Sequence, residues 1–316
     1  MSHPDLRLHP RAHGCGKVIL MGEHAVVHGE PALAAGLPGG LDLSALPLPD
    51  PQAPTRVRIP DWDLDLELRV GNEHPVARAC LAVLNQCDGP LRGWQIEGRS
   101  GLPSRAGLGS SATLSVALAR LVLGPEAEAA LLAECAQVGE EVFHGTPSGI
   151  DAAVAAAGGV IRFCRGAEPR ALTLGRPLPL AVIPSGIPRS TADQVAKVHR
   201  RLERHPSTGR ELLAGLREAT NACQVALEGG DLERVGELFD IGHGLLGAFD
   251  VSSPELDALA HAARAAGALG AKLTGAGGGG SLIAVAEDPA PIVDHFTARG
   301  LAAFSVVIES SGPTPG

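Results

Sequence analysis

Aromatic side chains are scarce in this sequence. Phenylalanine, tryptophan and tyrosine make up 3% of the 316 residues, and tyrosine is absent, so no tyrosine can act as an acid, a base or a stacking platform. Hydrophobic residues still reach 45% and charged residues 19%, which predicts a folded chain with a core of leucine, valine and alanine. The length is sufficient for two domains or for one large domain.

Positive charge is also in deficit. The 26 lysines and arginines are outnumbered by 35 aspartates and glutamates, which gives a formal net charge of −9. Nucleic acids and anionic membranes bind to basic surfaces, so we expect neither as a partner. A small anionic ligand stays possible, because a pocket can be positive locally.

Long apolar runs and paired cysteine motifs are missing as well. No segment approaches the ~18 consecutive apolar residues of a spanning helix, and the first residues, MSHPDLRLHPRAHG, lack the apolar region of a signal peptide. The six cysteines form no CxxC pair, which is typical of reduced thiols inside the cell. These absences predict a soluble cytoplasmic protein.

Strand-like and helix-like segments alternate along the chain, which predicts an α+β protein. Strands are expected at 12–20, in the second half of 56–70, at 93–100, 160–164 and 180–184, on both sides of the loop 274–281, and at 301–309. Helices are expected at 74–87, 110–123, 126–143 and 289–299, with three or four more between 191 and 267. A short helix should follow Thr146 as its N-cap, with Pro147 at its first position. The Pro/Gly-rich stretches 36–54 and 165–179 are interpreted as connections, and the domains as 1–179 and 180–316.

A glycine-rich turn, PSRAGLGSSA at residues 103–112, directly precedes the predicted helix 110–123. Small residues allow a tight turn whose N–H groups, together with the helix dipole, favour a phosphate group. An ordinary turn with a serine cap would look similar. The loop is no Walker A motif. The only Gly-Lys pair of the chain, at residues 16–17, lacks the upstream glycine and the following serine or threonine of that motif.

Two further segments carry polar groups in a pattern that suggests a pocket. GKVILMGEHAVVHG, residues 16–29, places Lys17 on a predicted strand ahead of Glu23 and His24. EEVFHGTPSGID, residues 140–151, places carboxylates at the end of one helix and the start of the next. Taken singly, these could be a surface lysine and helix-dipole partners. A zinc site at His24 and His28 is disfavoured, since no third ligand is apparent.

The segment KLTGAGGGGS, residues 272–281, contains a formal GxGxxG motif. A dinucleotide site requires a helix after the glycines, whereas SLIAVAE reads as another strand. We therefore expect this loop to lie against the phosphate loop or the substrate.

Taken together, these segments resemble the conserved regions of the GHMP small-molecule kinases, over residues 14 to 281. The segments 16–29 and 144–151 are similar to the mevalonate kinase branch in particular. The resemblance implies the GHMP kinase fold: an N-terminal domain with a left-handed βαβ crossover and a C-terminal ferredoxin-like domain. It also implies ATP and Mg²⁺ as cofactors, mevalonate as the small-molecule substrate, and a homodimer.

The resemblance assigns roles to individual positions of this chain. Lys17 matches the active-site lysine and Asp151 the catalytic aspartate, while Ser111 and Glu140 match the Mg²⁺ ligands. The phosphate-binding loop is matched by Arg105, Ala106, Gly107, Leu108, Gly109, Ser110 and Ser111. The substrate pocket is matched by Glu23, His24, Ser148, Gly149, Arg189 and Thr191.

The chain departs from the family pattern at several positions. Cys15 replaces a usual proline, Leu114 a frequent tyrosine and Ser281 a frequent cysteine, and Arg105 stands where glycine is common. The alternatives are a related kinase for phosphomevalonate or another small alcohol, a catalytically silent ligand-binding member of the fold, and an NAD(P)-dependent oxidoreductase.

Overall fold

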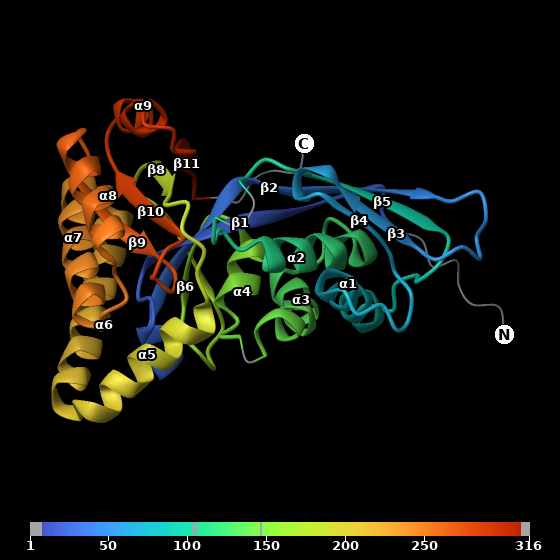
Figure 1. The fold of residues 1–316 in the computed structure, drawn as a ribbon, viewed down its shortest axis with the longest axis horizontal. Helices are drawn as coiled ribbons and strands as arrows, with labels where there is room; N and C mark the ends of the chain where they lie inside the picture. Colours follow the sequence, from blue (N-terminus) through green and yellow to red (C-terminus); the bar gives the residue numbers. More distant parts are fainter. Residues whose placement is uncertain (1–7, 104–105, 146, 311–316) are drawn as a thin grey trace.

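The computed structural model describes residues 8–103, 106–145 and 147–310 of the chain. These residues form two β-sheets, each covered by helices (Figure 1). The first sheet contains β1 (Arg11–Met21), β2 (Ala32–Pro47), β3 (Arg56–Ile59), β4 (Leu64–Glu67), β5 (Trp94–Ser100), β6 (Val160–Phe163) and β7 (Arg170–Leu172). The second contains β8 (Leu178–Pro184), β9 (Gly270–Thr274), β10 (Ser281–Val285) and β11 (Phe304–Ile308).

The helices fall into two groups. Those of the N-terminal part are η1 (Ala25–His28), η2 (Pro60–Trp62), α1 (Pro75–Gln86), α2 (Ser110–Leu123), α3 (Ala129–His144) and α4 (Ile150–Ala157). Those of the C-terminal part are α5 (Thr191–Arg204), α6 (Pro206–Gly229), α7 (Leu232–Ala248), α8 (Pro254–Ala265) and α9 (Ala290–Thr297). None of the helices in the described ranges is long and apolar enough to cross a membrane.

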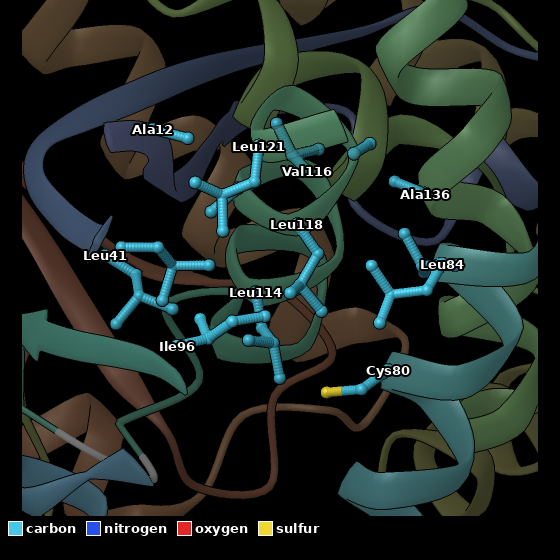
Figure 2. Packing of buried hydrophobic residues seen from close by; sticks show 14 of the residues in the cluster. Ala12, Leu41, Cys80, Leu84, Ile96, Leu114, Val116, Leu118, Leu121 and Ala136 are labelled. Atoms are coloured by element: carbon cyan, nitrogen blue, oxygen red, sulfur yellow. The ribbon is translucent and has the colours of Figure 1, made fainter. Parts of the chain in front are cut away.

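The first sheet is mixed, in the order β4-β3-β5-β2-β6-β7, with β1 paired to β2. Its pairs are antiparallel except β3 with β5, whose parallel strands are connected through β4 and α1. Helices α1 to α4 lie on one face of this sheet in Figure 1. Figure 2 shows the core beneath them, where Leu114, Leu118 and Leu121 of α2 pack between Leu41 and Ile96 of the sheet and the neighbouring helices.

The second sheet is fully antiparallel, in the order β11-β8-β10-β9. Helices α7 and α8 both pack on β9. A mixed N-terminal sheet and an antiparallel C-terminal sheet confirm the predicted α+β fold. Because β8 begins at Leu178 and pairs only with strands of the second sheet, the change from one sheet to the other falls before that residue.

The interpretation of 36–54 as a connection is wrong over most of its length, because β2 extends through Pro47. Two of its glycines, Gly36 and Gly40, are required by the close approach of other backbone segments, the C-cap of α4 at Gly36 and β1 at Gly40. A Cβ on Gly40 would lie 2.0 Å from the carbonyl oxygen of Gly14, and one on Gly36 would lie 2.8 Å from the Cα of Gly158. Leu37 and Leu41, each directly after one of these glycines, are fully buried, as expected in a central strand.

The helix expected after Thr146 begins later than predicted. Thr146 lies outside the described residues, and α4 starts at Ile150 with Gly149 as its N-cap, so Pro147 does not occupy the first helical position. Gly149 has φ 90°, a conformation that glycine adopts at little cost. The stretch 165–179 likewise holds β7 and the start of β8 rather than a plain connection. The other expected elements are confirmed, including four helices between 191 and 267.

Candidate active site

Lys17 and Asp151 meet at the centre of the N-terminal part. Lys17 lies within β1 and is 6% exposed, and Asp151 lies in the first turn of α4. The Lys17 Nζ is 3.1 Å from the Asp151 Oδ1, and the side chains of the two residues are 8% and 30% exposed. The ammonium is thus largely enclosed, while the carboxylate faces the open side of the site.

The glycine loop lies directly beside this pair. The backbone N–H of Lys17 donates to the carbonyl of Leu108 over 2.8 Å, which joins β1 to the loop. Gly109 is the N-cap of α2 with φ 84°, and no side chain caps the helix. The serines therefore do not cap α2, and its first N–H groups stay available to an anion. Arg105 lies outside the described residues.

Gly109 also makes room for Lys17. A Cβ at this position would lie 2.6 Å from the Lys17 Cγ and 3.3 Å from its Cε. The hydroxyl of Thr113 lies 2.8 Å from the carbonyl oxygen of Gly109 and 2.9 Å from that of Cys15, which ties the turn to β1. The absence of a side chain at 109 thus lets the lysine stem run past the loop.

Ser111 and Glu140 face each other at the start of α2 and the end of α3. Glu140 is 1% exposed, and its Oε1 has no hydrogen-bond partner among the described residues. Burial and the nearby charge of Asp151 raise the pKa of Glu140 to about 7. His144 lies between them, with its Nε2 3.3 Å from the Ser111 Oγ and 4.0 Å from the Glu140 Oε2. An unsatisfied buried carboxylate oxygen beside a hydroxyl fits a hard divalent cation.

No group of three or more His, Cys, Asp or Glu side chains converges as a metal site in the described part of the chain. A cation at Ser111 and Glu140 would therefore need further ligands from a nucleotide and water. Mg²⁺ commonly binds in this way, through one or two protein groups plus substrate phosphates.

Glu23 and His24 both follow β1, but they differ in what they contact. Glu23 is 3% exposed, and its carboxylate forms an ion pair with Lys272 of β9. His24 has φ 60°, and its Nε2 lies 2.9 Å from the carbonyl oxygen of Ala276. Burial lowers the pKa of His24 to about 4, so the ring is neutral near pH 7. The structure thus gives Glu23 a protein partner that the sequence did not indicate.

Arg189 connects the phosphate loop to the glycine loop 275–280. Its Nη1 donates to the carbonyl of Thr274 over 3.0 Å. A Cβ on Gly107, Gly275 or Gly280 would lie 2.6 to 2.7 Å from one of its guanidinium nitrogens. All three glycines also have positive φ angles, from 74° to 80°. They therefore form a lining without side chains around the cation.

The remaining predicted residues lie near the same place. Ser148 and Gly149 form the turn before α4, and Gly149 is the N-cap of the helix that carries Asp151. Thr191 is exposed at the first position of α5, two residues after Arg189. The structure thus joins Lys17, Asp151 and the glycine loop, and it brings Arg189 against that loop.

The GxGxxG segment connects β9 to β10, as the strand pattern predicted, with no helix after it. The hydroxyl of Ser281 donates to the carbonyl of Ala106 over 2.6 Å. The expectation that this loop lies against the phosphate loop is therefore confirmed.

Sequence reasoning missed two features of the structure. One is the contact of β9 with β1, in which the Thr274 hydroxyl bonds both the N–H and the carbonyl of Ile19. The other is a cavity of about 390 Å³ next to α1 and α3, rimmed by the 92% exposed Val70. It is lined by Val70, Gly71, Asn72, Glu73, Arg78, Leu81, Ala82, Asn85 and Val142. Its residues come from the loop before α1 and from the two predicted helices, and only the three-dimensional structure shows that these segments enclose a cavity.

Comparison with known proteins identifies relatives along nearly the whole chain. The N-terminal domain of the GHMP kinases matches residues 74–159, and the C-terminal domain of the GHMP kinases matches residues 223–298. The mevalonate kinase of Aeropyrum pernix is 34% identical over 310 residues, covering 90% of this chain and 90% of the relative. The mevalonate kinase of Candida albicans is 31% identical, covering 86% and 80%.

Solved structures agree with these relatives. The L. major mevalonate kinase in complex with R-mevalonate superposes with a TM-score of 0.85 at 29% identity, covering 99% of this chain and 100% of that one. The Methanococcus jannaschii mevalonate kinase superposes with a TM-score of 0.80 at 23% identity, covering 96% and 99%. The second match shows a common fold.

Proposed function

Since this chain belongs to the GHMP kinase family, whose members use ATP, we propose that it phosphorylates the 5-hydroxyl of mevalonate to give 5-phosphomevalonate. The observation that carries the proposal is the Lys17–Asp151 pair, 3.1 Å apart, beside a glycine loop at an uncapped helix N-terminus. Phosphoryl transfer requires mainly positioning and neutralisation of charge, and this arrangement supplies both. Relatives that cover most of the chain support mevalonate as the alcohol.

The two charged groups divide the activation of the hydroxyl. The Asp151 carboxylate takes the proton from the attacking oxygen, and the Lys17 ammonium stabilises negative charge on that oxygen or on the transferred phosphoryl group. The N–H groups of residues 106–111 bind the triphosphate. The backbone hydrogen bond from Lys17 to Leu108 places the base of the lysine side chain beside that loop.

Mg²⁺ would be held by the Ser111 hydroxyl and the Glu140 carboxylate. When bound, the ion neutralises charge on the phosphates that undergo transfer. The buried Glu140 Oε1, which lacks a partner among the described residues, is the observation that fits this role. His144 would have to leave its 3.3 Å contact with Ser111 when the hydroxyl turns to the ion.

The carboxylate of the substrate requires a cationic or hydrogen-bonding partner, for which Arg189, His24 and Thr191 are proposed. Ser148 and Gly149 border the same space from the turn before α4. Because His24 is neutral near pH 7, it contributes a hydrogen bond, and Arg189 supplies the positive charge. Glu23 supports this pocket from beneath, through its neighbour His24. Arg189→Ala should raise the KM for mevalonate, and an unchanged KM would remove this assignment.

The cavity next to α1 is proposed as the adenine pocket. Its volume of about 390 Å³ lies in the range of small-molecule sites. Leu81 and Val142 offer apolar surface for a base, and Asn72 and Asn85 offer amide groups. Asn85→Ala should then raise the KM for ATP and leave that for mevalonate unchanged.

The test is a panel of alcohols with ATP and Mg²⁺ in a coupled assay for ADP. Mevalonate should be turned over, and a preference for phosphomevalonate would favour the alternative kinase. No ADP release with any alcohol would indicate the silent ligand-binding alternative. Asp151→Asn should lower kcat by roughly 10²- to 10⁴-fold, the range for loss of a general base. A homodimer, proposed from the family resemblance alone, would be tested by light scattering of the purified protein.

A further inference from the structure

Three contacts join β9 and the loop after it to β1 and the loop after it. Lys272 pairs with Glu23, Thr274 bonds the backbone of Ile19 through its hydroxyl, and Ala276 accepts from His24 through its carbonyl. Lys272 and Thr274 lie on one face of β9, as alternate residues of a strand do, and Ala276 lies in the turn that follows. We call these three contacts the β1–β9 seam; they cross from the first sheet to the second.

The ion pair of the seam is buried on both sides. Lys272 is 0% exposed and Glu23 3% exposed, and the Lys272 Nζ also lies 5.9 Å from the centre of the Phe239 ring. A buried ion pair is often no more stabilising than a well-packed apolar pair of the same volume. Stability alone therefore gives no reason for two charges at this place. A better reason is their geometry, because the pair fixes the side chain of Glu23 against that of Lys272.

What the pair fixes is the residue after Glu23. His24 is one of four non-glycine residues in the described part of the chain with a positive φ angle, at 60°. Such a conformation persists only where the surroundings impose it. Here the side chain before it is held by Lys272 of β9, and its own ring by Ala276 of the loop after β9. The orientation of His24 is thus set from β9.

The same strand holds a second residue of the proposed pocket, because the carbonyl of Thr274 accepts from Arg189. We propose that Lys272 is a positioning residue: through Glu23 and the β1–β9 seam it holds His24 and Arg189 at the separation that the carboxylate of the substrate requires. This inference rests on the proposed function for the identity of the substrate. It adds a residue, Lys272, that lies outside the pocket and makes no contact with the substrate itself.

The test replaces both charges at once, in Glu23→Gln combined with Lys272→Met, because either single change leaves a buried charge without its partner. The double variant should fold, with a Tm close to that of the wild type. Its KM for mevalonate should rise about tenfold, while its KM for ATP stays within about twofold. A matched control is Lys197→Met combined with Asp250→Asn, which removes an ion pair of 2.9 Å at the surface and should leave both KM values unchanged.

A readout without substrate separates this inference from the proposed function. In ¹H–¹⁵N NMR, the His24 ring should show one fixed tautomer in the wild type, identified by the loss of its signal in His24→Gln. In the double variant that signal should shift to the average of a mobile ring. If the wild type prefers another alcohol, the proposed function fails, and the same KM comparison is made with that alcohol. An unchanged His24 signal, an unchanged KM for the alcohol, or loss of the fold in the double variant would overturn the role of Lys272.

Discussion

Replacement of Gly109 by alanine tests whether the glycine loop positions Lys17. The new Cβ would lie 2.6 Å from the Lys17 Cγ, about 0.8 Å short of the 3.4 Å at which ordinary contact begins. The lysine stem or the loop must therefore move by nearly 1 Å, which disturbs the 3.1 Å contact of Lys17 with Asp151. A misplacement of about 1 Å can reduce the rate by roughly 10²-fold, so we expect kcat to fall by about that factor.

The φ angle of 84° at Gly109 means that alanine there also strains the backbone, and this loss of stability has to be separated from the effect on Lys17. Alanine in this conformation costs about 1–2 kcal/mol of stability wherever it is placed. Gly300 provides the control, because its φ is 79° and a Cβ there would meet nothing within 4 Å. Gly300→Ala should lose similar stability in thermal unfolding and keep its kcat.

Both variants are assayed for ADP release with saturating mevalonate and ATP, at a temperature at which both are folded. If Gly109→Ala retains the kcat of Gly300→Ala, the contact between the loop and the lysine stem does not position the ammonium. The argument from Gly109 to catalysis is then refuted.

Three further predictions concern the surrounding contacts. Ser281→Ala removes the donor to the carbonyl of Ala106, so the free energy of unfolding should fall by about 1 kcal/mol and the KM for ATP should rise. Thermal unfolding and steady-state kinetics test this, with Ser305→Ala as the control. The buried His24 has a pKa of about 4, so it binds fewer protons in the folded than in the unfolded state. Its contribution to the free energy of unfolding is therefore complete above about pH 6.5 and declines as the pH falls toward 4. At pH 5 the loss should be about 2 kcal/mol. In urea unfolding, His24→Gln should lose less free energy of unfolding between pH 7 and pH 5 than the wild type loses. An equal loss would contradict a buried, neutral His24. In the wild type, EDTA should remove the activity that depends on Mg²⁺, and Glu140→Gln should lack that Mg²⁺-dependent activity from the start. Calorimetric titration of the ATP complex of Glu140→Gln with Mg²⁺ should show weaker binding than in the wild type.

The local pattern of the sequence was sufficient for most of the elements. Helix α2 begins and ends where the apolar run 110–123 predicted, and the strand pattern around the GxGxxG segment correctly excluded a dinucleotide site. The strand β2 was missed because glycine has two uses that look alike in a sequence. Gly36 and Gly40 serve close packing against other backbone segments, whereas Gly109 serves a turn. Only the neighbours in space distinguish these uses.

The candidate site was predictable as a set of residues but not as a set of contacts. The Lys17–Asp151 pair joins residues far apart in the chain, and the resemblance to a family was needed to bring them together. Lys272 carried no signal, because a lysine at the start of a glycine-rich segment is usually exposed. Its burial follows from the packing of α7 and β9, which no local pattern encodes.

The hydrogen bond between the N–H of Lys17 and the carbonyl of Leu108 has a mechanical consequence. Among the described strands, β1 pairs with β2 alone, and this bond ties the glycine turn to the other edge of β1. If the turn rearranges around an incoming nucleotide, it stays bonded to β1 at this point. The base of the Lys17 side chain would then remain beside the phosphates that the turn binds. A shift of that cation would then follow from a change in β1 itself or in a loop residue that touches the lysine stem, such as Gly109.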